Sequence, residues 1–427
     1  MAGQTSGVGL NKPNSLSQMG VSSGLLRTAW ANDIYMESLQ QEPFFNSAGL
    51  IEVVKIGTEG YQMPNKIFMN VTPSGKDGKG ARDVILSFCK SLQGTGRFGN
   101  AEGQLGQEER INLKYAKFYA NDWSHAVSGE SFGIDFRELT PYQIYLKAKP
   151  LLAQWFGELN GYFAREATCQ TRSLNLTKSP ISLSQPLNPN WYVPGVATAS
   201  QPAYKVSAAV HENLVGAALA GVVDANCHLT IPNLMKISDF AHDKYIKQMN
   251  VMGYDVHCLC VHPDEYRYLL DPSNSLSWGK YWVDAAALNN DLNKLFPGML
   301  GVINESLVVM RDRRSPTITL SGTSADYTFT FGYLKPGRND TRATARVANV
   351  NFNANLLYGA NALAKFEPEM PHYEEQYDEY DKYYGVGYFG AFAWQLPIWD
   401  IDTPADSPSL TTQSEGSMMV PTSRYNV

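Results

Sequence analysis

A single long helix is the feature of this sequence that most restricts its fold. Thr140 is a favourable N-cap, Pro141 takes the first helical position, and Gln143 completes a capping box. Apolar residues then recur every three or four positions, at Ile144, Ala148, Leu151, Leu152, Trp155, Phe156, Leu159 and Phe163. At about 1.5 Å per residue, a helix over 140–170 would be about 45 Å long, with a kink or a break at Pro150. We expect a supporting helix whose core is Leu151, Leu152, Trp155, Phe156 and Leu159.

Residues 61–127 alternate between strand-like runs and stretches dense in glycine. The runs are IFMNV, DVILSFC and INLKYAKFYA, and the glycine clusters lie at 75–80 and 94–106. Glycine gives a core no side chain, and a two-stranded hairpin is only marginally stable alone. We therefore predict a long two-stranded excursion that another surface supports.

The rest of the chain mixes helices and strands without strict alternation. We expect helices at about 230–249, 263–271 and 280–296, and strands at 256–261, 301–311, 326–334 and 385–396. Such a mixture indicates an α+β fold rather than a doubly wound parallel sheet.

Composition narrows the classes of function. Only 18% of the 427 residues are charged, the net charge is −6, and 24 residues are tyrosine. Low charge and abundant tyrosine are typical of surfaces covered by partners, and a dedicated nucleic-acid binder would be strongly basic. The five cysteines are too scattered for a disulfide framework, and the N-terminal residues lack the features of a signal peptide. We expect a soluble intracellular protein with no membrane partner.

Three sequence patterns resemble sites of chemistry. Residues 94–99 match G-x-G-x-x-G, but a strand rather than the required helix follows them. The cluster His257, Cys258, Cys260 and His262 lies on a strand that cannot bend around zinc, which favours core packing. The tyrosine-rich acidic tract at 367–384 favours an acidic loop at a subunit contact or an outer surface. We predict no catalytic, cofactor-binding or metal-binding residue, and no enzymatic activity.

The order of these features resembles the major capsid proteins of tailed bacteriophages, which share the Hong Kong-type shell fold with herpesvirus capsids and encapsulins. The loop motifs that carry the resemblance are Leu92-x-Gly94-x-Gly96-x-x-Gly99, a turn at Leu105 and Gly106, the pair Glu108-Glu109, and His125-Ala126-Val127. Later landmarks are His262-Pro263 with Tyr266, Gly298 with Gly301, and Tyr358-Gly359-Ala360-Asn361-Ala362. The resemblance covers about residues 50–400.

The resemblance implies a division of the chain into parts. These are an N-terminal arm at 1–50, an extended β-hairpin loop at 51–136, a peripheral domain at 137–210 and 346–400 that carries the spine helix, an axial domain at 211–345, and a C-terminal tail at 401–427. The loop would lie across a neighbouring subunit and contact it through Phe98, Ile111, Tyr115, Phe118 and Trp123.

The resemblance also implies a function and its partners. The chain would assemble as hexamers and pentamers into an icosahedral head that encloses double-stranded DNA, made in the host bacterial cytoplasm and found in the virion. Expected partners are a separate scaffolding protein, a portal, a decoration protein and DNA contacted without specificity. The alternatives are an encapsulin-like compartment shell, a head-decorating protein, and a carbohydrate-active enzyme that uses the acidic tract.

Overall fold

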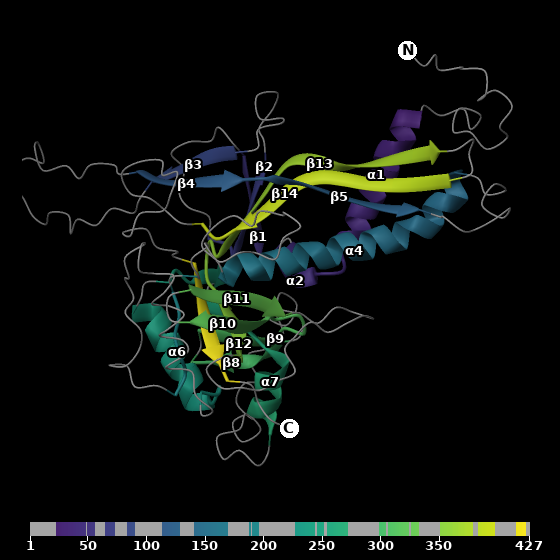
Figure 1. Cartoon of the computed structure of the whole chain (residues 1–427). Coiled ribbons are helices and arrows are strands. Elements are labelled where there is room, and N and C mark those ends of the chain that lie inside the picture. Colours follow the sequence, from purple (N-terminus) through teal and green to yellow (C-terminus); the bar gives the residue numbers. More distant parts are fainter. Residues whose placement is uncertain are drawn as a thin grey trace, which may run out of the picture.

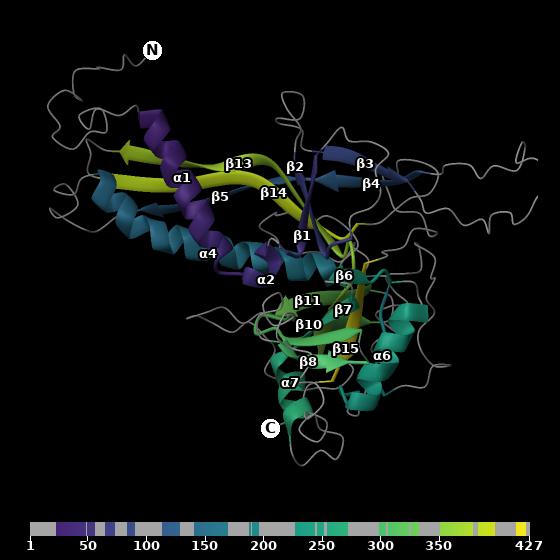
Figure 2. The same cartoon turned by 180° about the vertical axis from the view of Figure 1, so that it is seen from behind.

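The computed structural model describes residues 23–47, 49–55, 65–72, 83–89, 113–128, 141–169, 188, 190–195, 227–243, 246–251, 254–271, 299–304, 306–323, 326–332, 351–378, 383–397 and 416–423. They form two mixed sheets, one above and one below a long helix, α4, at Pro141–Cys169 (Figures 1 and 2). The helix predicted at 140–170 is therefore confirmed. Pro150 does not split it, because Pro150 and Leu146 are both exposed, so water can bond the Leu146 carbonyl that the proline leaves without an N–H partner.

The upper sheet has five strands in the order β1-β2-β13-β14-β5. Its strands are β1 (Ile51–Lys55), β2 (Phe68–Thr72), β13 (Leu363–Asp378), β14 (Tyr383–Gln395) and β5 (Asn121–Ser128). β1, β2 and β13 run parallel, whereas β14 is antiparallel to both β13 and β5. The helix α1 (Ser23–Leu39) crosses α4 and β13 on this side of the molecule (Figure 2).

The acidic tract predicted as a loop is mostly strand. Residues 367–378 belong to β13 and pair with β14. Tyr373 is buried against Trp30 and Tyr145, at ring-centroid distances of 5.6 and 6.0 Å. Because Tyr373 contributes to the core, the tract as a whole is not the exposed loop that its composition suggested.

A separate two-stranded sheet pairs β3 (Asp83–Cys89) with β4 (Leu113–Tyr119) in antiparallel register. Ala120 alone separates β4 from β5, so the chain passes directly from this ribbon into the upper sheet (Figure 1). Its base has a core of its own: Leu86, Phe88, Ala116 and Phe118 pack against residues of β2 and β13. The strands expected in the extended loop are thus shared between this ribbon and the five-stranded sheet.

The lower sheet has eight strands, six of them in the order β11-β10-β12-β7-β9-β8. These are β11 (Asp326–Gly332), β10 (Thr317–Thr323), β12 (Asn351–Tyr358), β7 (Tyr254–Val261), β9 (Leu307–Arg311) and β8 (Met299–Ile303). β15 (Ser417–Thr422) pairs with β12, and β6 (Met249–Val251) pairs with β7. The predicted strand at 301–311 is in fact the hairpin β8–β9, and the predicted helix at 280–296 lies outside the described residues.

The continuous apolar run of β7 has a simple explanation. Cys258 and Cys260 face the core beneath α4, while Leu259 and Val261 face a second core on the opposite side of the sheet. The helices α6 (Ile231–Asp243) and α7 (Pro263–Leu270) cover that second side. A strand covered on both faces carries a nearly continuous run of apolar residues. The helix predicted at 230–249 ends early, at Asp243, and Met249 begins β6.

Two predicted domain limits differ from the sheet pairing. β12 was expected in the peripheral domain, but it pairs with β10 and β7 of the lower sheet. Residues 417–422 were expected in a C-terminal tail, but as β15 they are buried along the free edge of β12. Both differences arise because backbone hydrogen bonding, rather than position along the chain, decides which sheet a strand joins.

An aromatic cluster joins the two sheets. The short helix α2 (Pro43–Asn46) places Phe44 and Phe45 between Phe68 of the upper sheet and Tyr358 at the end of β12. Phe45 also lies 5.9 Å from the ring of Trp394 on β14. One apolar core therefore runs through both sheets, and the molecule is packed as a single unit.

Candidate functional site

Four of the five residues predicted to form the core of the spine helix α4 pack in that core. Leu152 and Phe156 are fully buried, and Trp155 and Leu159 are partly buried against the same core. Leu151 was expected in this core, but its side chain is 57% exposed. Successive residues on a helix point about 100° apart, so Leu151 points well away from the direction of Leu152 and Phe156.

Two residues of the predicted loop contact lie in the core of their own chain. Trp123 on β5 stacks on Phe156 at a centroid distance of 4.3 Å, and it is 7% exposed. Phe118 on β4 is 1% exposed within the small core at the base of the ribbon. Tyr115 lies on β4, but its side chain, together with Phe98 and Ile111, is outside the described part of the chain. Contact of these residues with a neighbouring subunit stays a prediction.

A buried ionic joint, which sequence reasoning missed, connects the spine helix with the lower sheet. Arg165 donates from Nε to Asp312 Oδ2 at 2.6 Å and from Nη2 to Asp312 Oδ1 at 2.8 Å. Its two terminal nitrogens also donate to the carboxylate of Glu42, at 3.3 and 3.1 Å. Burial alone would lower the pKa of Arg165, but the two carboxylates outweigh it and raise that pKa. The guanidinium therefore remains charged and holds three segments together.

Two glycines of α4 leave the space that the N-terminal segment occupies beside this joint. A Cβ atom on Gly157 would lie 2.6 Å from the carbonyl oxygen of Ser38, and one on Gly161 would lie 2.4 Å from the side chain of Glu42. Gly157, Gly161 and Arg165 are four residues apart, so they share one face of the helix. This four-residue spacing of two glycines and an arginine is the sequence signal from which the ionic joint could have been predicted. Arg314 completes it with an ion pair to Glu42.

The His and Cys cluster packs as predicted. Cys258 and Cys260 are buried free thiols, and burial is the largest cause that raises the pKa of Cys260. His257 Nε2 lies 2.9 Å from the carbonyl oxygen of Ile246, and His262 Nδ1 accepts a hydrogen bond from the Asp264 N–H. Within the described ranges, no group of three or more His, Cys, Asp or Glu side chains is placed to hold a metal ion.

A second polar cluster contains the residue types of a hydrolase but not the geometry. His228 Nδ1 lies 2.9 Å from Glu265 Oε1, as in a Ser-His-Glu triad. However, Ser423 Oγ lies 3.2 Å from Nε2 and 3.5 Å from Nδ1 of the same ring. A hydroxyl almost equidistant from both nitrogens is not on the lone pair of Nε2, which a serine nucleophile needs. Through His228, the cluster instead links Ser423, which follows β15, to Glu265 of α7.

Comparisons with known proteins identify the fold. No family model matches the sequence, and no curated protein matches it either. Among solved structures, the capsid of Ralstonia phage GP4 aligns with a TM-score of 0.57 and 13% identity, over 87% of this chain and 94% of that chain. The capsid of cyanophage Pam1 aligns with a TM-score of 0.52 and 14% identity, over 89% of this chain and 92% of that chain.

These alignments extend over nearly the whole of each chain. The molecule therefore has the fold of a phage capsid protein. More specifically, the Hong Kong-type α+β capsid fold expected from the sequence is confirmed. Among the described residues, no helix is both long and apolar enough to cross a membrane.

Proposed function

We propose that this chain is the major capsid protein of a tailed bacteriophage, which assembles as hexamers and pentamers into the icosahedral head around the double-stranded DNA genome. The observation that carries the proposal is the likeness to two phage capsid structures over 87% and 89% of this chain. A structural role also suits a sequence without a catalytic constellation. The chain would act as a building block rather than as an enzyme.

The physical character of the chain supports repeated contact with copies of itself. Only 18% of its residues are charged, and 24 are tyrosine, the composition typical of surfaces that partners cover. The ribbon β3–β4 extends from one end of the upper sheet (Figure 1). We propose that the part of the loop beyond the base of this ribbon contacts a neighbouring subunit through Phe98, Ile111 and Tyr115.

The proposed assembly requires further partners. A separate scaffolding protein would guide shell closure, a portal would occupy one vertex, and a decoration protein would bind the finished head. Packaged DNA would meet an inner surface that is not strongly basic, because the net charge of the chain is −6. The subunit would be assembled in the bacterial cytoplasm and would remain in the virion.

Electron microscopy tests the proposal directly. The chain would be expressed alone and together with a scaffolding protein from the same source, and each product would be examined by negative stain. Closed hollow shells after co-expression support the proposal. Uniform shells from the chain alone would contradict the need for a separate scaffolding protein. Attachment to pre-existing shells would indicate a decorating protein. Discrete small particles that cleave polysaccharide would indicate an enzyme.

Limited proteolysis tests the role of the loop. The glycine clusters at 75–80 and 94–106 lose much entropy on ordering and supply few side chains for burial. We expect unassembled subunits to be cut within 75–106 and assembled shells to resist. Equal protection in both states would show that neighbouring subunits do not hold the loop.

A further inference from the structure

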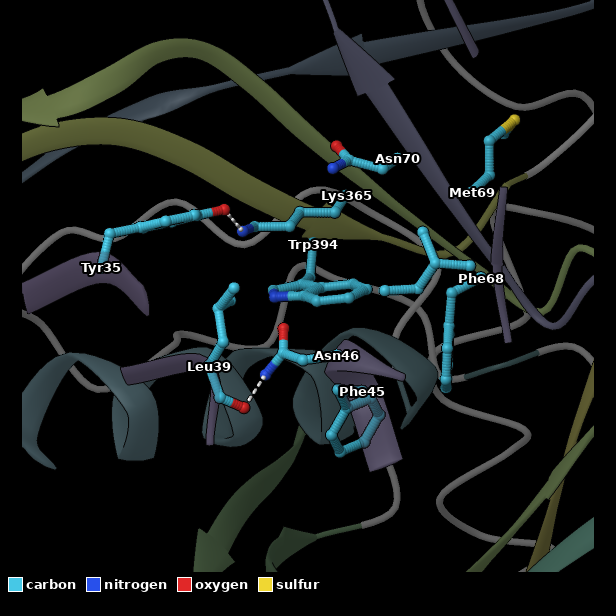
Figure 3. A pocket seen from close by; sticks show the side chains of 10 residues that line it. Tyr35, Leu39, Phe45, Asn46, Phe68, Met69, Asn70, Lys365 and Trp394 are labelled. Atoms are coloured by element: carbon cyan, nitrogen blue, oxygen red, sulfur yellow. Dashed lines mark hydrogen bonds between the residues drawn. The ribbon is translucent and has the colours of Figure 1, made fainter. Parts of the chain in front are cut away.

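The cavity between the N-terminal helices and the upper sheet is too small for an organic ligand. The rings of Phe45, Phe68 and Trp394 pack against one another there, at centroid distances of 5.3, 5.9 and 6.1 Å (Figure 3). The space that remains is about 100 Å³, less than the ~150 Å³ of a cavity that holds benzene. Contacts of this chain with other molecules are therefore expected at its surface.

Three arginines without an acidic partner lie close together on that surface. Arg311 ends β9, Arg313 lies in the turn that follows, and Arg267 is on α7; all three are exposed. The guanidinium carbon of Arg311 lies 5.1 Å from the centre of the Tyr266 ring, which places the end of β9 beside α7 in the lower half of the molecule (Figure 1). Within the described ranges, none of the three arginines forms an ion pair.

The buried ionic joint explains why these arginines lack an acidic partner. Asp312 lies between two of them in the sequence, but its carboxylate is bound at two points by Arg165. The carboxylate of Glu42 is bound by Arg165 and by Arg314. The two acidic and the two basic residues of the joint balance one another. The three exposed arginines are therefore left without a compensating charge beside them.

The acidic residues of α7 offer little charge at this surface. Glu265 is fully buried, where its carboxylate lies 2.9 Å from His228 Nδ1 and accepts a hydrogen bond from the Leu229 N–H. Asp264 is only 7% exposed, and Asp271, which follows the helix, is partly buried. The exposed arginines thus outnumber the exposed carboxylates of these two elements, on a chain whose net charge is −6.

This surface suits phosphate groups better than it suits a protein. A guanidinium presents its N–H donors in a planar fork that matches phosphate oxygens, and the Tyr266 ring supports the plane of Arg311. Stable protein interfaces have an apolar centre, but Leu270 is the only exposed large apolar residue of α7 and β9. A phosphate backbone needs no such centre, because basic side chains bind it through charge and counterion release.

We propose that Arg267, Arg311 and Arg313 bind the phosphate backbone of double-stranded DNA without sequence preference. The choice of DNA among polyanions rests on the proposed function, and in an assembled head this surface would face the packaged genome. With three phosphate contacts, the logarithm of the association constant should fall with the logarithm of the salt concentration with a slope of about −2.7. Binding this dependent on salt would hold the packaged DNA loosely.

Fluorescence anisotropy with a labelled short DNA duplex tests the proposal on the unassembled full-length chain, over a series of salt concentrations. The double variant Arg311→Gln with Arg313→Gln should weaken binding about tenfold or more at low salt and make the slope shallower by about 1.8. Arg267→Gln should make it shallower by about 0.9. Lys236→Gln, which removes an exposed cation on α6, is the matched control for Arg267→Gln and should leave the slope unchanged.

A labelled peptide with the sequence of residues 369–381 represents an acidic segment of a second copy of the chain. Tighter binding of this peptide than of DNA, lost in the arginine variants, would assign the surface to another subunit and overturn the proposal. No DNA binding by the unmodified chain at low salt, or an equal effect of Lys236→Gln and Arg267→Gln, would overturn it too.

Two further points keep the test decisive. If circular dichroism shows that the double variant does not fold, Arg267→Gln decides alone, because the Arg267 side chain makes no polar contact with a described residue. An unchanged slope in that variant would then overturn the proposal. Because the subunits are measured before assembly, a failure to bind DNA would leave the capsid function standing, and an absence of shells would not remove a measured affinity of these arginines for DNA.

Discussion

The guanidinium of Arg165 and the carboxylate of Asp312 form a two-point contact, with N–O distances of 2.6 and 2.8 Å, and both side chains are buried. The residues are 147 positions apart in the sequence. Arg165 lies on the spine helix and Asp312 lies in the turn after β9, so the contact joins the helix to the lower sheet. Glu42 binds the same guanidinium and brings in the N-terminal segment.

We expect Arg165→Met to reduce the free energy of unfolding by about 3–5 kcal/mol, because it leaves buried carboxylates without their partner. Urea denaturation measures the change. The matched control is Arg313→Met, at an exposed position in the same turn, which should change stability by less than about 0.5 kcal/mol. The double variant Arg165→Met with Asp312→Leu should recover part of the loss, and a loss that simply adds would contradict a direct pair.

The buried face of the spine helix gives a second prediction. Phe156→Ala should cost about 3–5 kcal/mol, because it opens a cavity between Trp123, Tyr388 and Phe392, which all contact the ring. Leu151→Ala, on the exposed face of the same helix, should cost less than about 0.5 kcal/mol. Chemical denaturation of both variants measures the two losses of stability. Similar losses would mean that Leu151 is buried after all.

The C-terminal strand gives a third prediction. Deletion of residues 416–427 removes β15, whose Met418, Met419 and Val420 are fully buried. Burial of each such side chain is worth about 1.5–3 kcal/mol, so the loss approaches the ~5–15 kcal/mol stability of a whole domain. We expect an insoluble or unfolded product by circular dichroism. Deletion of 424–427 alone should leave a folded chain, and a folded product from the longer deletion would argue that β15 is dispensable.

The fourth prediction concerns pH. Burial is the main cause that raises the pKa of Glu265 above 4.5, although His228 and the Leu229 N–H act in the opposite direction. A carboxyl group whose pKa is raised by folding contributes stability at low pH, and this contribution is lost as the pH rises through the folded pKa. The unfolding free energy of the unmodified chain minus that of Glu265→Gln should therefore fall as the pH rises above 4.5.

Thermal or urea unfolding between pH 4 and 8 measures this difference. Glu369→Gln, which changes an exposed carboxyl group on β13, serves as the control and should give a smaller slope. A difference that rises with pH would show that the charged form of Glu265 stabilises the fold.

Elements with local signals could be predicted from the amino-acid sequence alone. The pattern at Thr140 and Pro141 predicted the start of the spine helix to within about a residue, and Pro263 and Asp271 predicted the limits of α7. Capping residues and apolar periodicity act over a few neighbouring positions, so they can be read without knowledge of the rest of the chain. The buried strand β7 was also recognised, because both of its faces are covered.

Which distant segments meet became known from the packed fold and not from any local pattern. Asn353 of β12 pairs with Thr422 of β15, 69 positions later, which places a predicted tail inside the lower sheet. Trp123 could serve a neighbour or its own chain, and the fold places it on Phe156. Arg165 finds Asp312 for the same reason. Strand pairing and buried ion pairs depend on partners far along the chain, and nothing in the local pattern specifies which partner a residue will have.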